Sequence, residues 1–587
     1  MPSLRQAARR VLKNPMGFMR YWRIHATYDT IYAEQPITHI SREKRAMLGR
    51  RNPQRSLFSA QSLPHQVDPD SFYGRMAAIS SQLFHDDDLK DMYCLDNGRP
   101  SLPPSLMSGV MVLQFYDDVS DGEAVERTKY DLRWKVALDL PLDFPGFDPS
   151  SISVYRNRVV ENGQERYAFD RFVAAGREAG FIPDKVTLLT DTTCVKGAGA
   201  VQDTYTLLRK GVRKLLRALG YHVPGRRRGL SKQVRDLVEA YVEQDRKAEI
   251  DWSDPQARAE HLKVLVDDAE AVLDLAAEQA DDAEVRAIGW LLTKILGDDL
   301  VTDEEGNPQI GEGTAADRII SMTDPEMRHG RKSASRRFDG FKNSMSTELT
   351  SELILDITDV PAPGSDGAHL MPTIERVEAH AGVTVERVIG DGAYGSGDNR
   401  AACANYPDHS IDLVSPVSQP HDPEVDKSAF QIDLEARRAT CPQGYTVTGK
   451  DRKDRQGRPI LAFTFARSDC ETCPLFARCV HSKSAGRTVY THVHEALLRE
   501  ARQRHQTDEF KEIYRLRGRV EGKIAELVGH GLRETRYRGE QKRQLQRLWT
   551  GAAVNLKRLF KLAQTQEVDL GVVLASLSPC QTGSAPG

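Results

Sequence analysis

The chain has no stretch of about 18 consecutive apolar residues, so a membrane-spanning helix is not expected. Its basic N-terminus lacks the apolar core and small-residue cleavage site of a secretory signal. Eight cysteines in 587 residues argue against a disulfide framework. No internal repeat of fixed period is evident. These absences leave a protein of about three to five domains, which we expect in the cytoplasm without a membrane partner.

The net charge of −3 conceals segments of opposite sign. Residues 205–235 contain ten Lys or Arg and no Asp or Glu, and residues 511–561 carry fourteen basic against five acidic residues. Residues 1–55 are also basic, whereas residues 238–305 contain twenty acidic against six basic residues. Basic blocks of this kind suit a polyanion such as DNA, although solvated helix faces would give the same counts. The arginines that we expect to contact DNA are Arg226, Arg227, Arg228, Arg536 and Arg538.

Residues 71–165 show the pattern of a compact helical domain. Residues 105–116 are apolar at helical spacing, and Ser120 with Glu123 forms a capping box. Two helices joined by residues 117–119 would make a helix-turn-helix-like unit, and a further helix is predicted to start at Ser150. A small helical bundle with no role in DNA binding is the alternative.

Two short β-branched runs each lead to an aspartate. Residues 186–190 precede Asp191, and residues 383–389 precede Asp391, which lies between two glycines. In an open α/β sheet, ligand sites form at the carboxyl ends of the strands. Carboxylates gathered there repel one another unless they share a cation such as Mg²⁺ or Mn²⁺. For either aspartate alone, a strand-end carboxylate that caps a turn is the simpler explanation.

A third acid lies near the C-terminus. Tyr514, Arg517 and Glu521 are spaced at i, i+3 and i+7, so a continuous helix would place them on one face within roughly 60°. Such a face offers a carboxylate for a metal ion and a guanidinium for a phosphate. A salt-bridged surface helix is the alternative.

Four cysteines are clustered between the last two acids. Cys470 and Cys473 form a Cys-x2-Cys knuckle, Cys479 follows, and Cys441 lies upstream. Four thiolates suit tetrahedral zinc. The spacing after Cys473 is not that of a standard zinc finger, so a structural Zn²⁺ site and four free thiols both remain open.

Taken in order, these motifs resemble bacterial insertion-sequence transposases with an RNase H-like DDE domain. Residues 99–158 are similar to the family's InsH-type N-terminal domain. Asp191-Thr-Thr resembles the first acidic motif, residues 390–396 (GDGAYGS) resemble the second, and Tyr514, Arg517 and Glu521 match a Tyr-two-Arg-three-Glu signature. Further similar stretches follow at residues 536–539 and 555–558. Some relatives carry a Lys seven residues after the Glu, whereas this chain has Val528, with Lys523 or Arg533 as candidate substitutes.

The resemblance implies an active site of Asp191, Asp391 and Glu521 that holds two Mg²⁺ or Mn²⁺ ions. It implies cleavage of transposon ends and joining of the freed 3′-hydroxyl to target DNA, with Tyr514 and Arg517 gripping the DNA backbone. The expected partners are terminal inverted repeats, target DNA and a second copy of the chain, in a bacterial cytoplasm beside the nucleoid. A catalytically inactive DNA-binding regulator and a structure-specific nuclease are the alternatives.

The expected fold class is α/β, with an RNase H-like core of a mixed sheet and flanking helices. To this core we add an all-α N-terminal domain, a helical insertion and a small Cys-rich insertion. The expected boundaries are a basic arm at 1–70, the helical DNA-binding domain at 71–165, the catalytic domain at 183–199, 315–420 and 507–565, the charged helical insertion at 200–314, the Cys-rich insertion at 421–495, and a disordered tail at 566–587.

Overall fold

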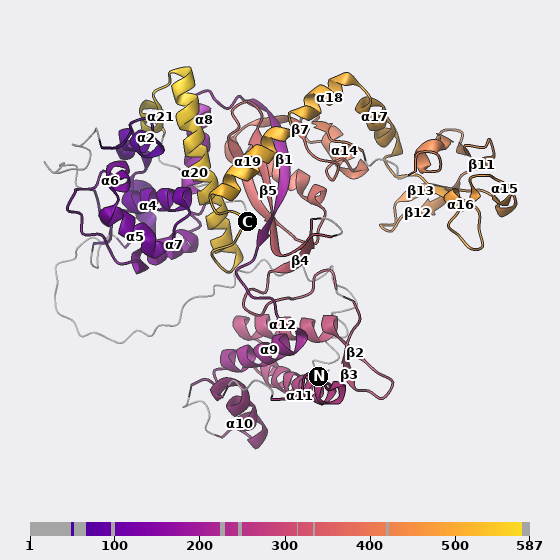
Figure 1. The fold of residues 1–587 in the computed structure, drawn as a ribbon, viewed down its shortest axis with the longest axis horizontal. Helices are drawn as coiled ribbons and strands as arrows, with labels where there is room; N and C mark the ends of the chain where they lie inside the picture. The colour runs from indigo at the N-terminus through magenta and orange to yellow at the C-terminus, as the bar shows by residue number, and fades with distance from the viewer. Residues whose placement is uncertain are drawn as a thin grey trace.

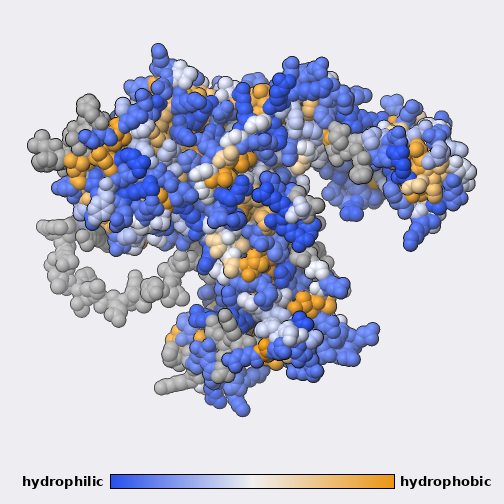
Figure 2. Space-filling model, in the orientation of Figure 1, coloured by the Kyte–Doolittle hydropathy of each residue, from blue (hydrophilic) through white to orange (hydrophobic). Residues whose placement is uncertain are grey.

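The computed structural model of the chain describes residues 48–51, 66–94, 100–223, 229–244, 249–313, 315–332, 335–417 and 422–577. Three parts are visible in Figure 1: a sheet with a helical bundle beside it, a helical lobe below, and a small β-rich lobe at the right. Among the described residues, no helix is long and apolar enough to span a bilayer. Hydrophilic residues cover most of the face drawn in Figure 2.

The central sheet is mixed, which confirms the α/β prediction for the core. β5 pairs antiparallel with β1 and with β6, whereas β1, β7 and β8 run parallel. β4 pairs with the beginning of β5, so the order across the middle of the sheet is β6-β5-β1-β7-β8. The strands are β1 (Lys185–Lys196), β4 (Arg328–Arg331), β5 (Arg337–Glu348), β6 (Ile354–Val360), β7 (Thr384–Ile389) and β8 (Asp412–Val414).

The N-terminal helices pack against this sheet through one shared core. α4 is buried along almost its whole length, and Ser120 caps α5 by accepting a hydrogen bond from the backbone N–H of Glu123, as predicted. α20 lies between the bundle and the sheet, in contact with α4, α8 and β6. The helices are α2 (Phe72–Ala78), α3 (Ser80–Leu83), η2 (Asp86–Met92), α4 (Pro104–Asp117), α5 (Asp121–Tyr130), α6 (Leu132–Ala137), α7 (Ser150–Glu161), α8 (Tyr167–Glu178) and α20 (Glu540–Gln566).

A helical lobe leaves the sheet after β1 and returns before β4. Its buried side chains, such as Leu215, Val272 and Leu292, form a core separate from that of the sheet. The acidic segment of the sequence supplies two of its helices, whose charged faces are exposed. The elements are α9 (Thr204–Ala218), α10 (Lys232–Val238), the π-helical turn η4 (Glu239–Glu243), α11 (Pro255–Ala277), α12 (Ala283–Asp299), β2 (Leu300–Thr302) and β3 (Pro308–Ile310).

The cysteine lobe, residues 422–491, follows β8 and carries two small antiparallel sheets, β9-β10-β11 and β12-β13-β14. Helix α17 then returns the chain to the central sheet. The elements are η6 (Lys427–Ala429), β9 (Gln431–Asp433), β10 (Arg438–Thr440), β11 (Thr446–Thr448), β12 (Lys450–Lys453), β13 (Pro459–Thr464), α15 (Arg467–Glu471), α16 (Phe476–Cys479), β14 (Thr488–Tyr490) and α17 (Glu495–His505).

The structure corrects three expectations. β1 does not end at Asp191 but continues to Lys196, because β5 pairs with it along this whole stretch. The predicted helix through Tyr514 and Glu521 is two helices, α18 (Asp508–Arg515) and α19 (Gly518–Gly529), with a turn at residues 516–517. The predicted disordered tail at 566–587 contains an ordered helix, α21 (Leu570–Ser576), because Leu574 is fully buried against the N-terminal helices.

Candidate active site

Asp191 and Asp391 occupy matching positions relative to two adjacent parallel strands, Asp191 within β1 and Asp391 just beyond the end of β7. The register of β1 and β7 ends at Leu189 opposite Ile389, and each aspartate lies two residues further on. β7 stops there, whereas β1 continues against β5. Asp191 therefore lies in extended backbone with a paired strand on one side only. The open side is the sheet edge at which the Asp391 turn lies.

The turn that carries Asp391 is held against the end of β8. The Gly390 N–H donates to the carbonyl of Val414 at 3.2 Å, and the Ser415 hydroxyl donates to the carbonyl of Asp391 at 2.5 Å. Gly395 approaches Pro416 so closely that an added Cβ would lie 2.3 Å from its carbonyl oxygen. Asp391 itself accepts the backbone N–H of Ala393 at 2.9 Å. Backbone contacts therefore fix this carboxylate at the sheet edge.

Arg517 links the first acid to the third. Its Nη1 donates to Asp191 Oδ2 at 2.9 Å, and its Nη2 donates to Glu521 Oε1 at 2.5 Å. The side chains of Asp191 and Arg517 are 16% and 20% exposed, whereas that of Glu521 is 58% exposed. The turn between α18 and α19 places Arg517 between the two carboxylates, so the ion pair joins α19 to β1. Glu521 is the acid that solvent reaches most freely.

The charges of these groups act on one another. Burial raises the pKa of the Asp191 carboxyl, and the charge of Asp391 adds to this, while Arg517 and the backbone N–H of Thr192 oppose it. Burial also raises the pKa of Tyr514, with Asp391 and Asp191 contributing and Arg517 opposing. Burial lowers the pKa of Arg517, but the charges of Asp191, Tyr514, Glu521 and Asp391 outweigh it, so the pKa of Arg517 is raised. The five predicted residues are therefore neighbours in one electrostatic cluster.

Sequence reasoning missed a second layer behind Asp191. Thr192 donates its backbone N–H to Asp191 at 2.8 Å and its hydroxyl to Asp366 at 2.7 Å. Asp366, in η5 (Asp366–His369), also forms an ion pair with Lys342 of β5 at 2.8 Å. No local pattern marks Asp366 or Lys342, because the contacts join segments that are far apart in the sequence.

The predicted DNA-contacting arginines have different surroundings. Arg226, Arg227 and Arg228 lie outside the described residues. Arg538 is exposed. Arg536 forms an ion pair with Asp118, donates to the carbonyl of Val119 and lies over the Phe115 ring. Its contacts therefore hold the start of α20 against the N-terminal helices, which leaves little of this side chain for DNA.

The two candidate substitutes for a lysine at position 528 also differ. Lys523 is buried and paired with Glu526 at 2.7 Å. Arg533 donates to the Thr193 hydroxyl at 3.2 Å and to the Cys194 carbonyl at 3.0 Å, so it lies against β1 close to Asp191. Of the two, Arg533 is the cation beside the acidic edge.

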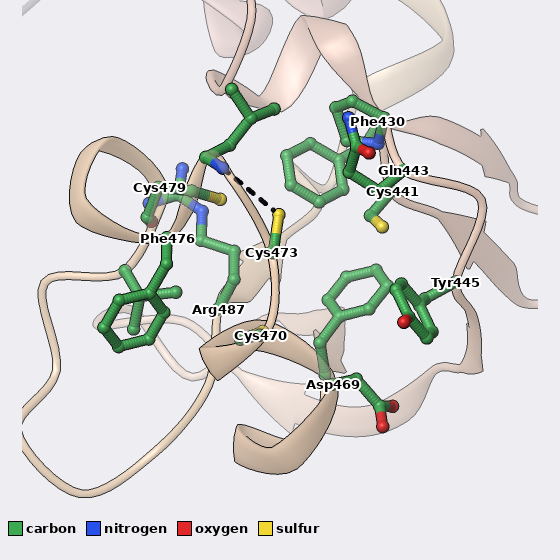
Figure 3. A pocket seen from close by; sticks show the side chains of 14 residues that line it. Phe430, Cys441, Gln443, Tyr445, Asp469, Cys470, Cys473, Phe476, Cys479 and Arg487 are labelled. Carbon is green, nitrogen blue, oxygen red and sulfur yellow. Dashed lines mark hydrogen bonds between the residues drawn. The ribbon is translucent and has the colours of Figure 1, made fainter.

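The four clustered cysteines line one pocket (Figure 3). The Leu475 N–H donates to Cys473 Sγ at 3.4 Å. Burial raises the pKa of Cys479, the thiols of Cys470, Cys473 and Cys441 add to this, and Arg487 opposes it. Among the residues that the structure describes, however, no three Cys, His, Asp or Glu side chains lie close enough together to hold a metal ion.

The site is a cluster of carboxylates at the edge of a mixed sheet. Two sequence comparisons indicate the family to which a chain with such a site belongs. A family model described as a transposase DDE domain matches residues 440–560, and one described as a transposase domain (DUF772) matches residues 61–158. Together they support the assignment of the chain to the insertion-sequence DDE transposases and confirm the resemblance inferred from its motifs. The first match includes Arg517 and Glu521 but neither aspartate. No curated protein and no solved structure matched the chain.

Proposed function

We propose that this protein is an active DNA transposase that cleaves the ends of an insertion sequence and joins them to target DNA. The observation that carries the proposal is the cluster of Asp191, Asp391 and Glu521 around Arg517 at the edge of a mixed sheet. The strand order β6-β5-β1-β7-β8, in which β5 alone runs antiparallel to the other four, supports an RNase H-like core. The two transposase domain matches support DNA as the substrate.

The three acids offer the oxygen ligands that Mg²⁺ or Mn²⁺ prefers, and the cluster already attracts one cation, Arg517. Among the described residues no three such side chains lie close enough together to hold a metal ion, so the three carboxylates would have to draw together around it. Asp191, Asp391 and Glu521 would hold the metal. When bound, a pair of such ions activates the attacking oxygen and stabilises the leaving oxygen of a phosphoryl transfer. The carboxylates would then bind the metal in place of Arg517, and the freed guanidinium would bind the scissile phosphate through two parallel hydrogen bonds.

The reaction has two steps of the same kind. Water attacks a phosphate at the transposon end, the P–O bond to the 3′-oxygen breaks, and a 3′-hydroxyl is released. That hydroxyl then attacks a target phosphate and displaces another 3′-oxygen, so one phosphodiester replaces another. Arg517 and Tyr514 orient the backbone, Thr192 and Asp366 keep the Asp191 segment in place, and the chain is proposed to act as a homodimer on paired ends.

We also propose a structural Zn²⁺ on Cys441, Cys470, Cys473 and Cys479. The four thiols come from separate segments and line the same pocket, and the buried Nε of Arg487, which also lines it, has no hydrogen-bond partner among the described residues. Four thiolates around one Zn²⁺ carry a net negative charge that this arginine would offset. The thiols must close inward on the metal, and four of them leave no open position for catalysis.

One assay separates this function from its alternatives. The purified protein is incubated with Mg²⁺ and the DNA ends that flank its own gene, and nicked and joined products are resolved on gels. We expect binding, nicking and strand joining. Binding without nicking would indicate a regulator, nicking without joining would indicate a nuclease, and the absence of DNA binding would contradict the assignment altogether.

A further inference from the structure

A second polar groove lies outside the acidic cluster, between α17 and the sheet β9-β10-β11 of the cysteine lobe. It is open and has a volume of roughly 680 Å³. Four cations line it, against two acids. The cations are Lys427, Arg438, Arg499 and Arg502, and the acids are Asp433 and Glu495.

Strand alternation makes one face of this sheet polar. Ile432 and Ala439 are buried in the core of the lobe, whereas their neighbours along the strands line the groove. The register places Thr440 opposite both Gln431 and Thr446, and Arg438 opposite Asp433. The sheet therefore presents hydroxyl, amide and guanidinium donors to the groove.

Helix α17 supplies the other wall. Glu495, Arg499 and Arg502 are four and three residues apart and so share a face of the helix. Glu495 is 2% exposed, forms an ion pair with Lys427 and accepts the His492 backbone N–H at 2.8 Å. The charge of Glu495 is thus neutralised within the wall. The helix face therefore presents the positive charges of Arg499 and Arg502 to the groove.

The remaining acid and cations complete this picture. Asp433 accepts the backbone N–H groups of Glu435 and Ala436 at 3.0 and 2.9 Å, so it closes a turn. Arg438 is exposed and forms no ion pair with any residue that the structure describes. Arg502 is 35% exposed, and its nearest acid, Glu495, is 3.5 Å away. The four cations of the groove exceed its two acids by two charges, so a net positive charge remains for a ligand.

The groove is also fixed relative to the acidic cluster. Arg504 of α17 binds Asp412 of β8 through two hydrogen bonds, one of them 3.0 Å long, and α17 packs on α14 (Gly397–Ala404), the helix that follows the Asp391 turn. The chain continues from α17 through α18 to Arg517 and Glu521. The helix that forms one wall of the groove is therefore attached to the same sheet edge that carries the Asp391 turn.

We infer that this groove binds the phosphodiester backbone of DNA that extends from the active site. Arginines together with Ser, Thr and Gln side chains are the groups that contact DNA phosphates without reading the sequence. The inference rests on the proposed function, because it takes DNA as the ligand of the neighbouring site. On this inference, the groove of the cysteine lobe holds DNA in position while the active site cleaves it.

The test is the salt dependence of binding to a short duplex of arbitrary sequence by the full-length protein. Each phosphate contact contributes about 0.9 to the slope of log affinity against log salt concentration. We expect Arg438→Ala with Arg502→Ala to reduce that slope by about 1.8, while Arg438→Lys, which keeps the charge, retains the wild-type slope. Arg258→Ala with Lys263→Ala on the acidic helix α11 removes the same charge elsewhere and should leave the slope unchanged.

The outcomes separate the groove from the function. A wild-type slope in the groove variant, with an unchanged melting temperature, would overturn the inference and leave the proposed function standing. An unchanged slope combined with loss of self-association would assign the groove to a second copy of the chain and would also overturn it. Absence of DNA binding by the wild-type protein would remove the proposed function and the groove together. If the double variant misfolds, Arg438→Gln alone, on an exposed strand position, should reduce the slope by about 0.9.

Discussion

Arg517 is the residue on which the arrangement of the acidic cluster depends, because its guanidinium donates hydrogen bonds to both Asp191 and Glu521. The sequence spacing indicated a cation near Glu521. It did not predict the contact with Asp191, because that contact depends on how a distant helix packs on β1. The same reason explains why Asp366 and Lys342 were missed, whereas the two candidate aspartates were predicted from their own strands.

Replacing Arg517 with Ala should damage cleavage much more than DNA binding. Loss of one positioned charged donor at a phosphoryl group costs on the order of 100-fold in rate, whereas end binding depends on many contacts elsewhere. Nicking rates and gel-shift affinities measured on the same preparation test this. Arg515→Ala, an exposed arginine two residues away, is the matched control and should nick at the wild-type rate. Equal losses of nicking and binding would contradict the role.

Asn555 has a structural role that its place in a family-like stretch does not indicate. Its amide accepts the Ile354 N–H at 2.8 Å and donates to the Ile354 carbonyl at 2.9 Å, and it is fully buried. Asn555→Leu leaves both backbone groups unsatisfied, so the free energy of unfolding should fall by about 2–4 kcal/mol. Chemical denaturation measures it. The control is Lys561→Ala on the exposed face of the same helix, which should change the free energy of unfolding by less than about 0.5 kcal/mol. An equally small change for Asn555→Leu would contradict the structural role of Asn555.

At the scale of elements, periodicity located the helices and strands but not where they end. The i, i+3, i+7 spacing of Tyr514, Arg517 and Glu521 predicts one continuous helix. The chain turns at residues 516–517 instead, since α18 contacts β8 whereas α19 packs on β1 and β5. Similarly, the short apolar segment after residue 569 has no amphipathic repeat long enough to predict a helix. Its partners, α3 and α8, lie some 400 residues earlier in the chain.

Helix α21 should contribute to the free energy of unfolding, which a disordered tail would not do. Leu574 is fully buried, and the fully buried Arg171 donates to its carbonyl at 3.3 Å. Leu574→Ala should lower the free energy of unfolding by about 2–5 kcal/mol. Val572→Ala, at a position 65% exposed on the same helix, is the control. Equal melting temperatures for the two variants and the wild type would show that α21 does not pack as described.

The cysteine lobe should depend on a bound metal. Six buried apolar side chains form its core, which is too little for a lobe of this size to be stable without a further link. We expect one zinc ion per chain by elemental analysis of the wild-type protein, and none after Cys470→Ser with Cys473→Ser. Cys94→Ser, at an exposed position far from the lobe, should retain the zinc. A wild-type protein without zinc would leave four free thiols as the correct interpretation.

At the scale of the whole molecule, two insertions interrupt one sheet. The helical lobe separates β1 from β4 and β5, and the cysteine lobe separates β8 from the helix that carries Glu521. Charge composition marked the helical insertion as distinct in the sequence, and the clustered cysteines marked the second one. Neither signal could indicate that the N-terminal helices share a core with the sheet, because that core depends on α20, which lies near the other end of the chain.

The arrangement of these lobes separates opposite charges. The acidic helices α11 and α12 lie in the lower lobe of Figure 1, whereas the cysteine lobe with its cationic groove lies beyond α14 and α17. DNA phosphates are repelled by carboxylates and attracted by arginines. A path for DNA from the acidic edge along α17 therefore avoids the acidic helices α11 and α12.

The most direct test of the account is metal-dependent nicking of end DNA by three variants, Asp191→Asn, Asp391→Asn and Glu521→Gln. Each removes a carboxylate charge but keeps the shape of the side chain, so each should lower nicking by about 1000-fold or more while DNA binding stays close to that of the wild type. Glu512→Gln, an exposed acid on α18, should nick normally. Wild-type nicking by any one of the three variants would remove that acid from the site and contradict the central claim.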